Sequence, residues 1–214
     1  MEQNTAILIA DLSGYSALTD AHGASTAAGI IDTYLAIVGE SLSGSATLHE
    51  RIGDEVMIVS ESADDLINTA VRLVDNASKE THFLQIHGGL HYGKILKYNN
   101  HYFGSPVNHA SRIASQAKKG TFWVSSAFIK KLLNPGNYLF SPKGKFQFKN
   151  INEMIEVHEL VVNNQPAYYV DPICRMLVNQ EQAIQHPREK EIFFCSTDCL
   201  HASLQNADSK LMLV

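Results

Sequence analysis

Strand pairs alternate with helices along residues 5–162, and this order limits the fold to a few architectures. The run TAILIAD (5–11) is apolar until its final aspartate, which is typical of a strand buried on both faces. Apolar spacing predicts a helix over 25–42, and a hairpin over 46–60 is expected to turn at Gly53-Asp54. Neighbouring hairpins combined with crossover helices predict an α+β sandwich, in which helices pack on a largely antiparallel sheet.

The remainder of this segment continues the same alternation. Ser62 and Asp65 resemble a capping box at the start of a helix. Residues 83–98 are expected to form two strands that turn near Tyr92-Gly93. The later elements are expected to be a helix, a strand, a short helix and two closing strands, at 104–120, 121–126, 127–133, 138–150 and 154–162.

Composition limits the partners of the chain. Its 214 residues are 45% hydrophobic and 18% charged, as in a globular protein with a substantial core. The net charge of −5 argues against non-specific binding to nucleic acid, which needs a basic surface. The N-terminal stretch has no basic region and an apolar run of only six residues, so we expect neither a signal peptide nor a membrane span. A cytoplasmic location follows as the expectation.

Two aspartates and a helical Asn/Arg pair are the chemical candidates of this segment. Asp11 ends the first strand, and Asp54 lies at the tip of a hairpin that can pair beside that strand. Adjacent carboxylates repel, and a divalent cation such as magnesium relieves the repulsion, commonly with nucleotide phosphates as further ligands. Asn108 and Arg112 are four residues apart on one helical face, where an arginine can bind phosphate. Taken singly, such residues are more often caps or solvated surface.

Several stretches, in order, resemble the catalytic domains of class III nucleotidyl cyclases, the adenylyl and guanylyl cyclases. The resemblance covers roughly residues 5–160, and its longest part contains the Val-Asn-x-Ala-x-Arg core. It implies a ferredoxin-like α+β sandwich with a mostly antiparallel sheet. The matching stretches are ILIADLSGYSALTD, ERIGDEVMIV, IHGGLHYGKI, HYFGSPVNHASRIASQAKKGTFWVSS and FKNINEMIEVHEL.

This resemblance implies a role for each matching residue. Asp11 and Asp54 would hold two magnesium or manganese ions, which bind a nucleoside triphosphate and activate its ribose 3′-hydroxyl. Asn108 would orient the ribose, and Arg112 would stabilise the charge on the transferred phosphoryl group. Lys149 loosely matches a phosphate-binding lysine. In this family the site forms between two subunits, so the resemblance also implies a homodimer.

The positions that would contact the nucleobase depart from the family pattern. Glu50 stands where adenylyl cyclases have a lysine and guanylyl cyclases have a glutamate that accepts hydrogen bonds from guanine, which favours GTP over ATP. His101 stands at the second base-reading position, where family members usually carry Asp, Thr or Cys. This implies either an unusual base pocket or one that has lost its role. Glu50 is alternatively an ordinary surface residue that pairs with Arg51.

The C-terminal segment carries all three cysteines, Cys174, Cys195 and Cys199. A distant cysteine followed by a close pair is typical of metal-ligand spacing, and thiolates suit zinc or copper(I). The pattern resembles YHS domains and the related TRASH-type metal-binding modules, which divides the chain into 1–162 and 168–214. The fourth-ligand candidates are Asp171, Asp198 and His201. The alternative is a metal-free unit with three buried thiols.

Two functions are compatible with these patterns. The first is a nucleotidyl cyclase that forms a 3′,5′-cyclic nucleotide and pyrophosphate from GTP or ATP, with a C-terminal metal-binding module. The second is a catalytically degenerate cyclase-like domain that acts as a nucleotide- or metal-responsive regulatory module. The aspartates and the Asn/Arg pair favour the enzyme, while His101 favours the second interpretation.

Overall fold

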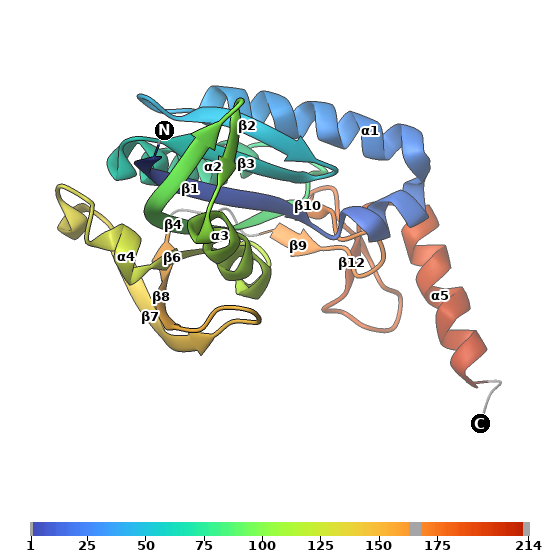
Figure 1. The fold of residues 1–214 in the computed structure, drawn as a ribbon. Coiled ribbons are helices and arrows are strands. Elements are labelled where there is room, and N and C mark those ends of the chain that lie inside the picture. Colours follow the sequence, from blue (N-terminus) through green and yellow to red (C-terminus); the bar gives the residue numbers. More distant parts are fainter. Residues whose placement is uncertain (1, 163–167, 212–214) are drawn as a thin grey trace.

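The structure is a computed structural model that describes residues 2–162 and 168–211, with the backbone alone for 206–211. In the described residues, the main sheet has eight strands in the order β2-β3-β1-β4-β6-β8-β7, with β5 paired to β4 (Figure 1). These strands are β1 (Glu2–Ser13), β2 (Thr47–Ile52), β3 (Glu55–Ser60), β4 (Gln85–Tyr98), β5 (His101–Phe103), β6 (Phe122–Ser125), β7 (Leu139–Gln147) and β8 (Met154–Val161). All these pairings are antiparallel except β4–β6, which is parallel, so the predicted largely antiparallel sheet is confirmed.

Helices cover both faces of this sheet. They are α1 (Tyr15–Ser41), α2 (Ala63–Ala77), α3 (Ser105–Gln116) and the short α4 (Ser126–Ile129), followed by the 3-10 turn η1 (Pro135–Asn137). The start of α2 forms as expected, because the Ser62 hydroxyl accepts a hydrogen bond from the Asp65 N–H at 3.1 Å. Among the described helices, not one combines the length and the apolar character that crossing a membrane requires.

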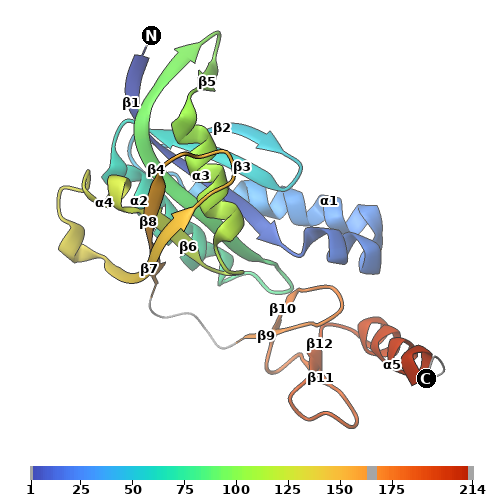
Figure 2. The same cartoon turned by 60° about the horizontal axis from the view of Figure 1, so that its bottom comes forward.

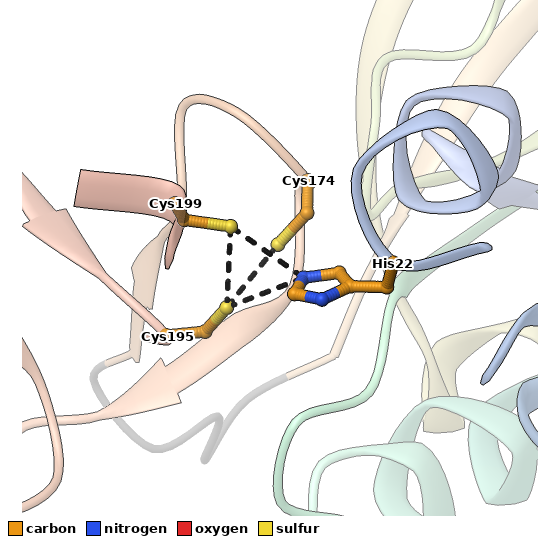
Figure 3. A group of neighbouring side chains, drawn as sticks. All are labelled: His22, Cys174, Cys195 and Cys199. Carbon is orange, nitrogen blue, oxygen red and sulfur yellow. Dashed lines mark hydrogen bonds between the residues drawn. The ribbon is translucent and has the colours of Figure 1, made fainter. Parts of the chain in front are cut away.

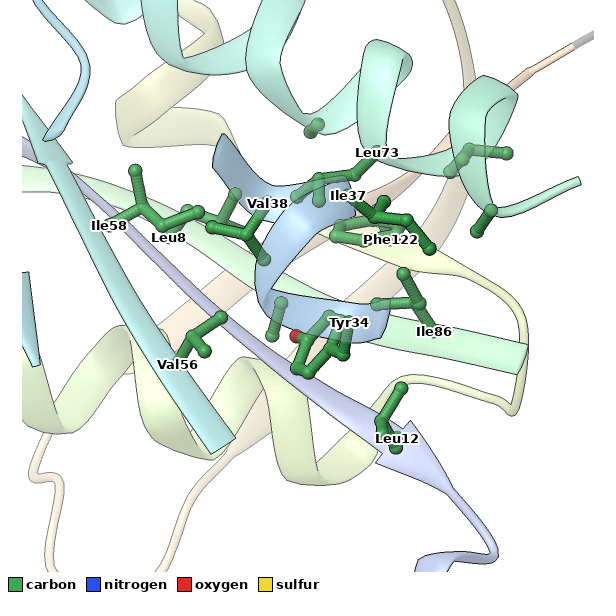
Figure 4. Close-up of a cluster of buried hydrophobic side chains, with 14 of the residues drawn as sticks. Leu8, Leu12, Tyr34, Ile37, Val38, Val56, Ile58, Leu73, Ile86 and Phe122 are labelled. Atoms are coloured by element: carbon green, nitrogen blue, oxygen red, sulfur yellow. The ribbon is translucent and has the colours of Figure 1, made fainter. Parts of the chain in front are cut away.

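Side-chain alternation along β1 decides which helical layer each residue meets. Even-numbered residues such as Leu8 join one buried cluster with α1 and α2, including Val38 (Figure 4). Odd-numbered Ile7 and Ile9 pack instead with α3. Asp11 continues the odd-numbered series, so the alternation directs it to the face that α3 covers.

The long strand β4 corrects one prediction. The chain does not turn near Tyr92-Gly93, because β4 runs without interruption from Gln85 to Tyr98. Gly93 serves packing instead, since a Cβ there would lie 2.5 Å from the Pro106 Cγ at the start of α3. The reversal occurs at Asn99-Asn100, whose positive φ angles of 46° and 62° suit a two-residue hairpin turn.

Helix α1 begins ten residues before the predicted start at residue 25, and it is interrupted once. Gly23 has φ 80° and ψ 167°, outside the helical range, so α1 consists of an initial piece that ends at His22 and a longer second piece. Only glycine adopts this conformation readily, because it has no Cβ. The interruption lets the two pieces follow different directions.

The C-terminal unit packs against the larger one. It contains β9 (Tyr168–Val170), β10 (Leu177–Asn179), β11 (Ile184–Gln185), β12 (Phe193–Phe194) and α5 (Thr197–Leu211). The backbone N–H of Leu177 donates to the Phe83 carbonyl at 2.7 Å, and the Tyr168 hydroxyl donates to the Ser78 carbonyl. Met176 and Phe194 belong to the same buried cluster as α1 and α2. The larger unit therefore provides much of the small unit's core.

Candidate functional site

A group of carboxylates forms where the β2–β3 turn meets the end of β1. Asp54 occupies the turn and Glu55 begins β3, while the register pairs Ala10 of β1 with Val56 of β3. Burial first, and then the charge of Asp54, raise the pKa of Asp11 from 3.8 to about 7. Burial and Asp54 also raise the pKa of Glu55. The fold thus brings the two predicted aspartates together.

The Asp11 carboxylate suits a hard divalent cation. Within the described part of the chain, its Oδ1 atom is buried and has no hydrogen-bond partner, which is costly for a polar atom. Two or three adjacent carboxylates supply the oxygen ligands that magnesium and manganese prefer. A cation at this point would both satisfy Oδ1 and offset the repulsion from Asp54.

Two residues beside this group have no counterpart in the sequence predictions. His87 pairs with Asp11 in the β1–β4 register, and its Nδ1 lies 2.9 Å from the Ser13 hydroxyl oxygen. Burial lowers the pKa of His87. Tyr34 of α1 is fully buried, and burial followed by the charges of the carboxylates raises its pKa. Sequence spacing gave no signal for either residue, because their proximity to the carboxylates arises only from tertiary packing.

The Asn108 and Arg112 side chains lie on the exposed side of α3. Helix α3 approaches β4 very closely, because a Cβ on Gly89 would lie 2.3 Å from the Ala114 backbone nitrogen. Among the described residues, neither side chain has a hydrogen bond or an ion pair. The predicted helical pair therefore forms, but no side chain or backbone group in the described part of the structure binds it.

The two base-reading candidates line one shallow hollow of about 140 Å³, together with His49 and Asn100. Glu50 comes from β2, next to an irregularity in the strand register, and His101 begins β5. Both side chains are exposed. The fold thus brings together Glu50 and His101, which are far apart in the sequence.

Lys149 is exposed in the turn between β7 and β8. Phe148 and Ile151, on either side of it, share a buried cluster with Ile113 of α3. The turn that carries Lys149 therefore packs against the helix that carries Arg112.

The three cysteines converge, and a histidine from the larger unit joins them (Figure 3). The four ligand atoms of His22, Cys174, Cys195 and Cys199 all lie within 4.8 Å of one another. The Cys195 sulfur is 3.4 Å from that of Cys174 and 3.7 Å from that of Cys199. His22 Nε2 lies 3.6 Å from the Cys195 sulfur and 3.5 Å from the Cys199 sulfur. The predicted convergence of the thiols is thus present.

The predicted fourth-ligand candidates do not join this cluster, whose fourth group is His22. Asp171 is fully buried, but its oxygens accept backbone N–H bonds from Ile173, Cys174 and Cys195 at 2.7, 3.1 and 2.8 Å. Although burial raises the pKa of Asp171, these three donors lower it below its ordinary value. Asp171 therefore holds the two cysteine-bearing segments together. Asp198 and His201 are exposed.

Because the sulfurs lie so close together, the three thiols have different pKa values. The hydrogen bond from the Cys174 thiol lowers the pKa of Cys195 to about 6, and the same bond raises the pKa of Cys174. Burial raises the pKa of Cys199 to about 12. Without a cation, the hydrogen bond between the Cys174 and Cys195 thiols therefore favours ionisation of Cys195 over ionisation of Cys174.

Comparison with known proteins places this geometry in context. A stretch of 125 residues is 38% identical to an uncharacterized protein of Mycobacterium tuberculosis, covering 58% of this chain and 33% of that protein. An adenylate cyclase of Streptomyces griseus is 26% identical over 137 residues, covering 64% of this chain and 34% of that enzyme. The chain thus spans about a third of the length of the curated relatives that it matches.

Solved structures of cyclases have the same fold as this chain. The adenylyl cyclase CyaB from P. aeruginosa superposes with a TM-score of 0.65 at 17% identity, covering 77% of this chain and 97% of that one. The guanylate cyclase domain of RhGC from Catenaria anguillulae, solved in complex with GTP, gives a TM-score of 0.63 at 18% identity, with 77% and 100% covered. Residues 1–162 match the adenylate and guanylate cyclase catalytic domain, and the chain belongs to that family.

Proposed function

We propose that this chain is a nucleotidyl cyclase that converts GTP or ATP into the 3′,5′-cyclic nucleotide and pyrophosphate. The observation that carries the proposal is the half-buried Asp11 carboxylate, whose Oδ1 atom is buried and unpaired among the described residues and whose pKa is raised by burial and by Asp54. A structural carboxylate would normally have hydrogen-bond donors around it. This one instead faces further carboxylates, as expected of a cation site.

In the proposed reaction, the ribose 3′-oxygen attacks the α-phosphorus and displaces pyrophosphate. A pair of magnesium or manganese ions held by Asp11 and Asp54 would acidify the 3′-hydroxyl and neutralise the triphosphate. Asn108 orients the ribose by hydrogen bonding. Arg112 and Lys149 donate hydrogen bonds to phosphate oxygens as charge develops on the transferred group and the leaving group.

The proposed site is shared between two copies of the chain. Asn108 and Arg112 are exposed and have no partner among the described residues, as expected if a second subunit supplies the nucleotide and cations that they contact. The paired ends of β4 and β5 project from one end of the sheet, beside the start of β1 (Figure 2). Tyr98 and Phe103 there are 61% and 52% exposed, which suits a homodimer interface.

Glu50 and His101 are proposed to contact the base, with GTP as the preferred substrate. Both line the hollow between β2 and β5. A glutamate accepts hydrogen bonds from guanine N1–H and N2–H, whereas adenine offers no matching pair of donors. Glu50→Lys should therefore reduce turnover of GTP more than that of ATP. Equal losses with both nucleotides would show that Glu50 does not contact the base.

For the C-terminal unit we propose a YHS-type metal-binding module with zinc or copper(I) on Cys174, Cys195 and Cys199. Its main support is that the Cys195 sulfur lies 3.4 Å from that of Cys174 and 3.7 Å from that of Cys199. All three cysteines are free thiols, which suits a cytoplasmic location.

The direct test is incubation of the purified full chain with manganese and ATP or GTP, followed by mass spectrometry of the products. Cyclic product that depends on Asp11 and Arg112 would support the proposal. A mixture of the Asp11→Asn and Arg112→Ala variants, each inactive alone, should recover about a quarter of the wild-type rate if two-fold dimers exchange subunits. Absence of product despite nucleotide binding would instead favour the catalytically degenerate module.

A further inference from the structure

The separations within the Cys/His cluster match a metal-centred tetrahedron. With zinc–sulfur bonds of about 2.3 Å and zinc–nitrogen bonds of about 2.0–2.1 Å, tetrahedral geometry places sulfurs about 3.8 Å apart and nitrogen about 3.6 Å from sulfur. Two sulfur–sulfur distances are 3.4 and 3.7 Å, and two nitrogen–sulfur distances are 3.6 and 3.5 Å. The other two separations, from Cys174 to Cys199 and to His22, are within 4.8 Å. Four ligands at these separations can surround one cation with little rearrangement.

The cluster draws its ligands from both units of the chain. Cys174, Cys195 and Cys199 belong to the C-terminal unit, whereas His22 ends the first piece of α1, immediately before the interruption at Gly23. Figure 3 shows the imidazole of His22 pointing from α1 towards the three sulfurs. We propose that His22 completes a Cys₃His site for Zn²⁺, and that the bound ion fastens the C-terminal unit to the start of α1.

The proposed fastening acts on the segment that directly follows Asp11. Residues 12–22 lead from Asp11 to His22, and Gly14 lies on this path. A Cβ on Gly14 would lie 2.5 Å from the Arg175 Cβ, so the residue after Cys174 packs directly on this segment. Zinc would therefore restrain the segment through His22 and would hold Arg175 against Gly14.

We therefore expect bound zinc to affect the carboxylates around Asp11. This expectation alone rests on the proposed cyclase function. The zinc site is chemically distinct from the carboxylate group, because thiolates select zinc while carboxylates select magnesium or manganese. Loss of zinc should loosen residues 12–22 and weaken manganese binding at Asp11. The zinc site itself requires no cyclase activity.

The test uses the full chain, reduced and freed of metal by a chelator, and titrated with Co²⁺ as a spectroscopic substitute for Zn²⁺. Thiolate-to-cobalt charge-transfer bands and intense tetrahedral d–d bands at one equivalent are expected, and Zn²⁺ should displace the cobalt. His22→Ala should change the d–d bands and weaken binding by more than about 100-fold, since even indirect partners of a ligand contribute about 10–100-fold. His201→Ala is the matched control, because that exposed histidine should leave the spectrum unchanged.

Three outcomes would overturn the inference. Absence of tetrahedral cobalt bands in the wild type would remove the site. A His22→Ala spectrum and affinity equal to those of the wild type would show a site built from thiolates alone, as a copper(I) centre would be. A change on His201→Ala equal to that on His22→Ala would assign the fourth ligand to α5.

Hydrogen exchange separates this inference from the proposed function. Zinc should slow amide exchange in residues 12–22 of the wild type but not of His22→Ala, whether or not the chain forms any cyclic nucleotide. Cobalt binding and zinc-dependent protection without cyclase activity would support the zinc site and refute the cyclase proposal. Cyclase activity with no zinc-dependent protection would refute the fastening.

Discussion

Asp11→Asn removes the carboxyl group whose ionisation the folded chain opposes. Burial and Asp54 raise the pKa of Asp11 from 3.8 to about 7. Because the folded-state pKa lies above the unfolded-state value, the unfolded chain releases this proton first, and stability falls as the pH rises through that window. A shift of about three pKa units corresponds to at most about 4 kcal/mol once the group is fully ionised, and to less at Asp11, because this half-buried carboxylate is partly screened by solvent.

Urea unfolding in the presence of EDTA at pH 5 and pH 8 measures this contribution. Between these pH values, Asp11 alone should lower the free energy of unfolding of the wild type by about 1–2 kcal/mol after allowance for solvent screening, and Asp11→Asn should lack that decrease. Asp20→Asn, at an exposed aspartate of α1, is the matched control and should follow the wild type. The same pH dependence in Asp11→Asn and in the wild type would refute the reasoning.

Manganese extends the test to the proposed cation site. At 100 times its dissociation constant, a ligand that binds only the folded state stabilises that state by about 2.7 kcal/mol. At pH 8 the wild type should gain about this much, and Asp11→Asn much less. Equal gains in both proteins would show that manganese binds elsewhere.

Three further substitutions test the packing, each by urea unfolding of the metal-free protein. Gly89→Ala places a Cβ 2.3 Å from a backbone nitrogen of α3, so the helix must move by about 1 Å. We expect the free energy of unfolding to fall by about 1–3 kcal/mol, and a change near zero would contradict the close approach. Gly23→Ala should lower the free energy of unfolding by about 1–3 kcal/mol, because residue 23 has a φ of 80°. Gly29→Ala, at a regular position of the same helix, should raise it by about 0.5–1 kcal/mol. Equal effects of the two substitutions would argue against the interruption. Tyr34→Phe removes a buried hydroxyl that has no partner among the described residues and should stabilise the protein by about 1 kcal/mol, while a marked loss would reveal a hidden partner.

Local chemistry predicted those parts of the fold that depend on neighbouring residues. The turn at Gly53-Asp54 and the cap at Ser62 form as expected, because turns and caps are decided within a few residues. The predicted turn near Gly93 failed because that glycine serves the packing of α3 rather than a change of direction. A glycine in a strand can mark either a turn or the close packing of another element, and only the tertiary structure distinguishes the two.

Of the candidate sites, too, the sequence could predict one and could not predict all of the other. The convergence of Asp11 with Asp54 could be predicted, since a hairpin places its turn beside the strand that it pairs with. His22 could not be predicted, because nothing near it in the sequence indicates a partner in the C-terminal segment. The only available signal was the incomplete ligand pattern of the three cysteines, which pointed to residues close to them.

His22 precedes Cys199 by 177 residues, and this separation has a consequence for biosynthesis. Domains generally fold from the N-terminus during translation, so the larger unit can form while the cysteines are still unmade. The four-ligand cluster can assemble only after the ribosome has added Cys199. Truncated products would retain His22 and the carboxylates but lack the complete cluster, so a filled cluster would mark chains that were synthesised through Cys199.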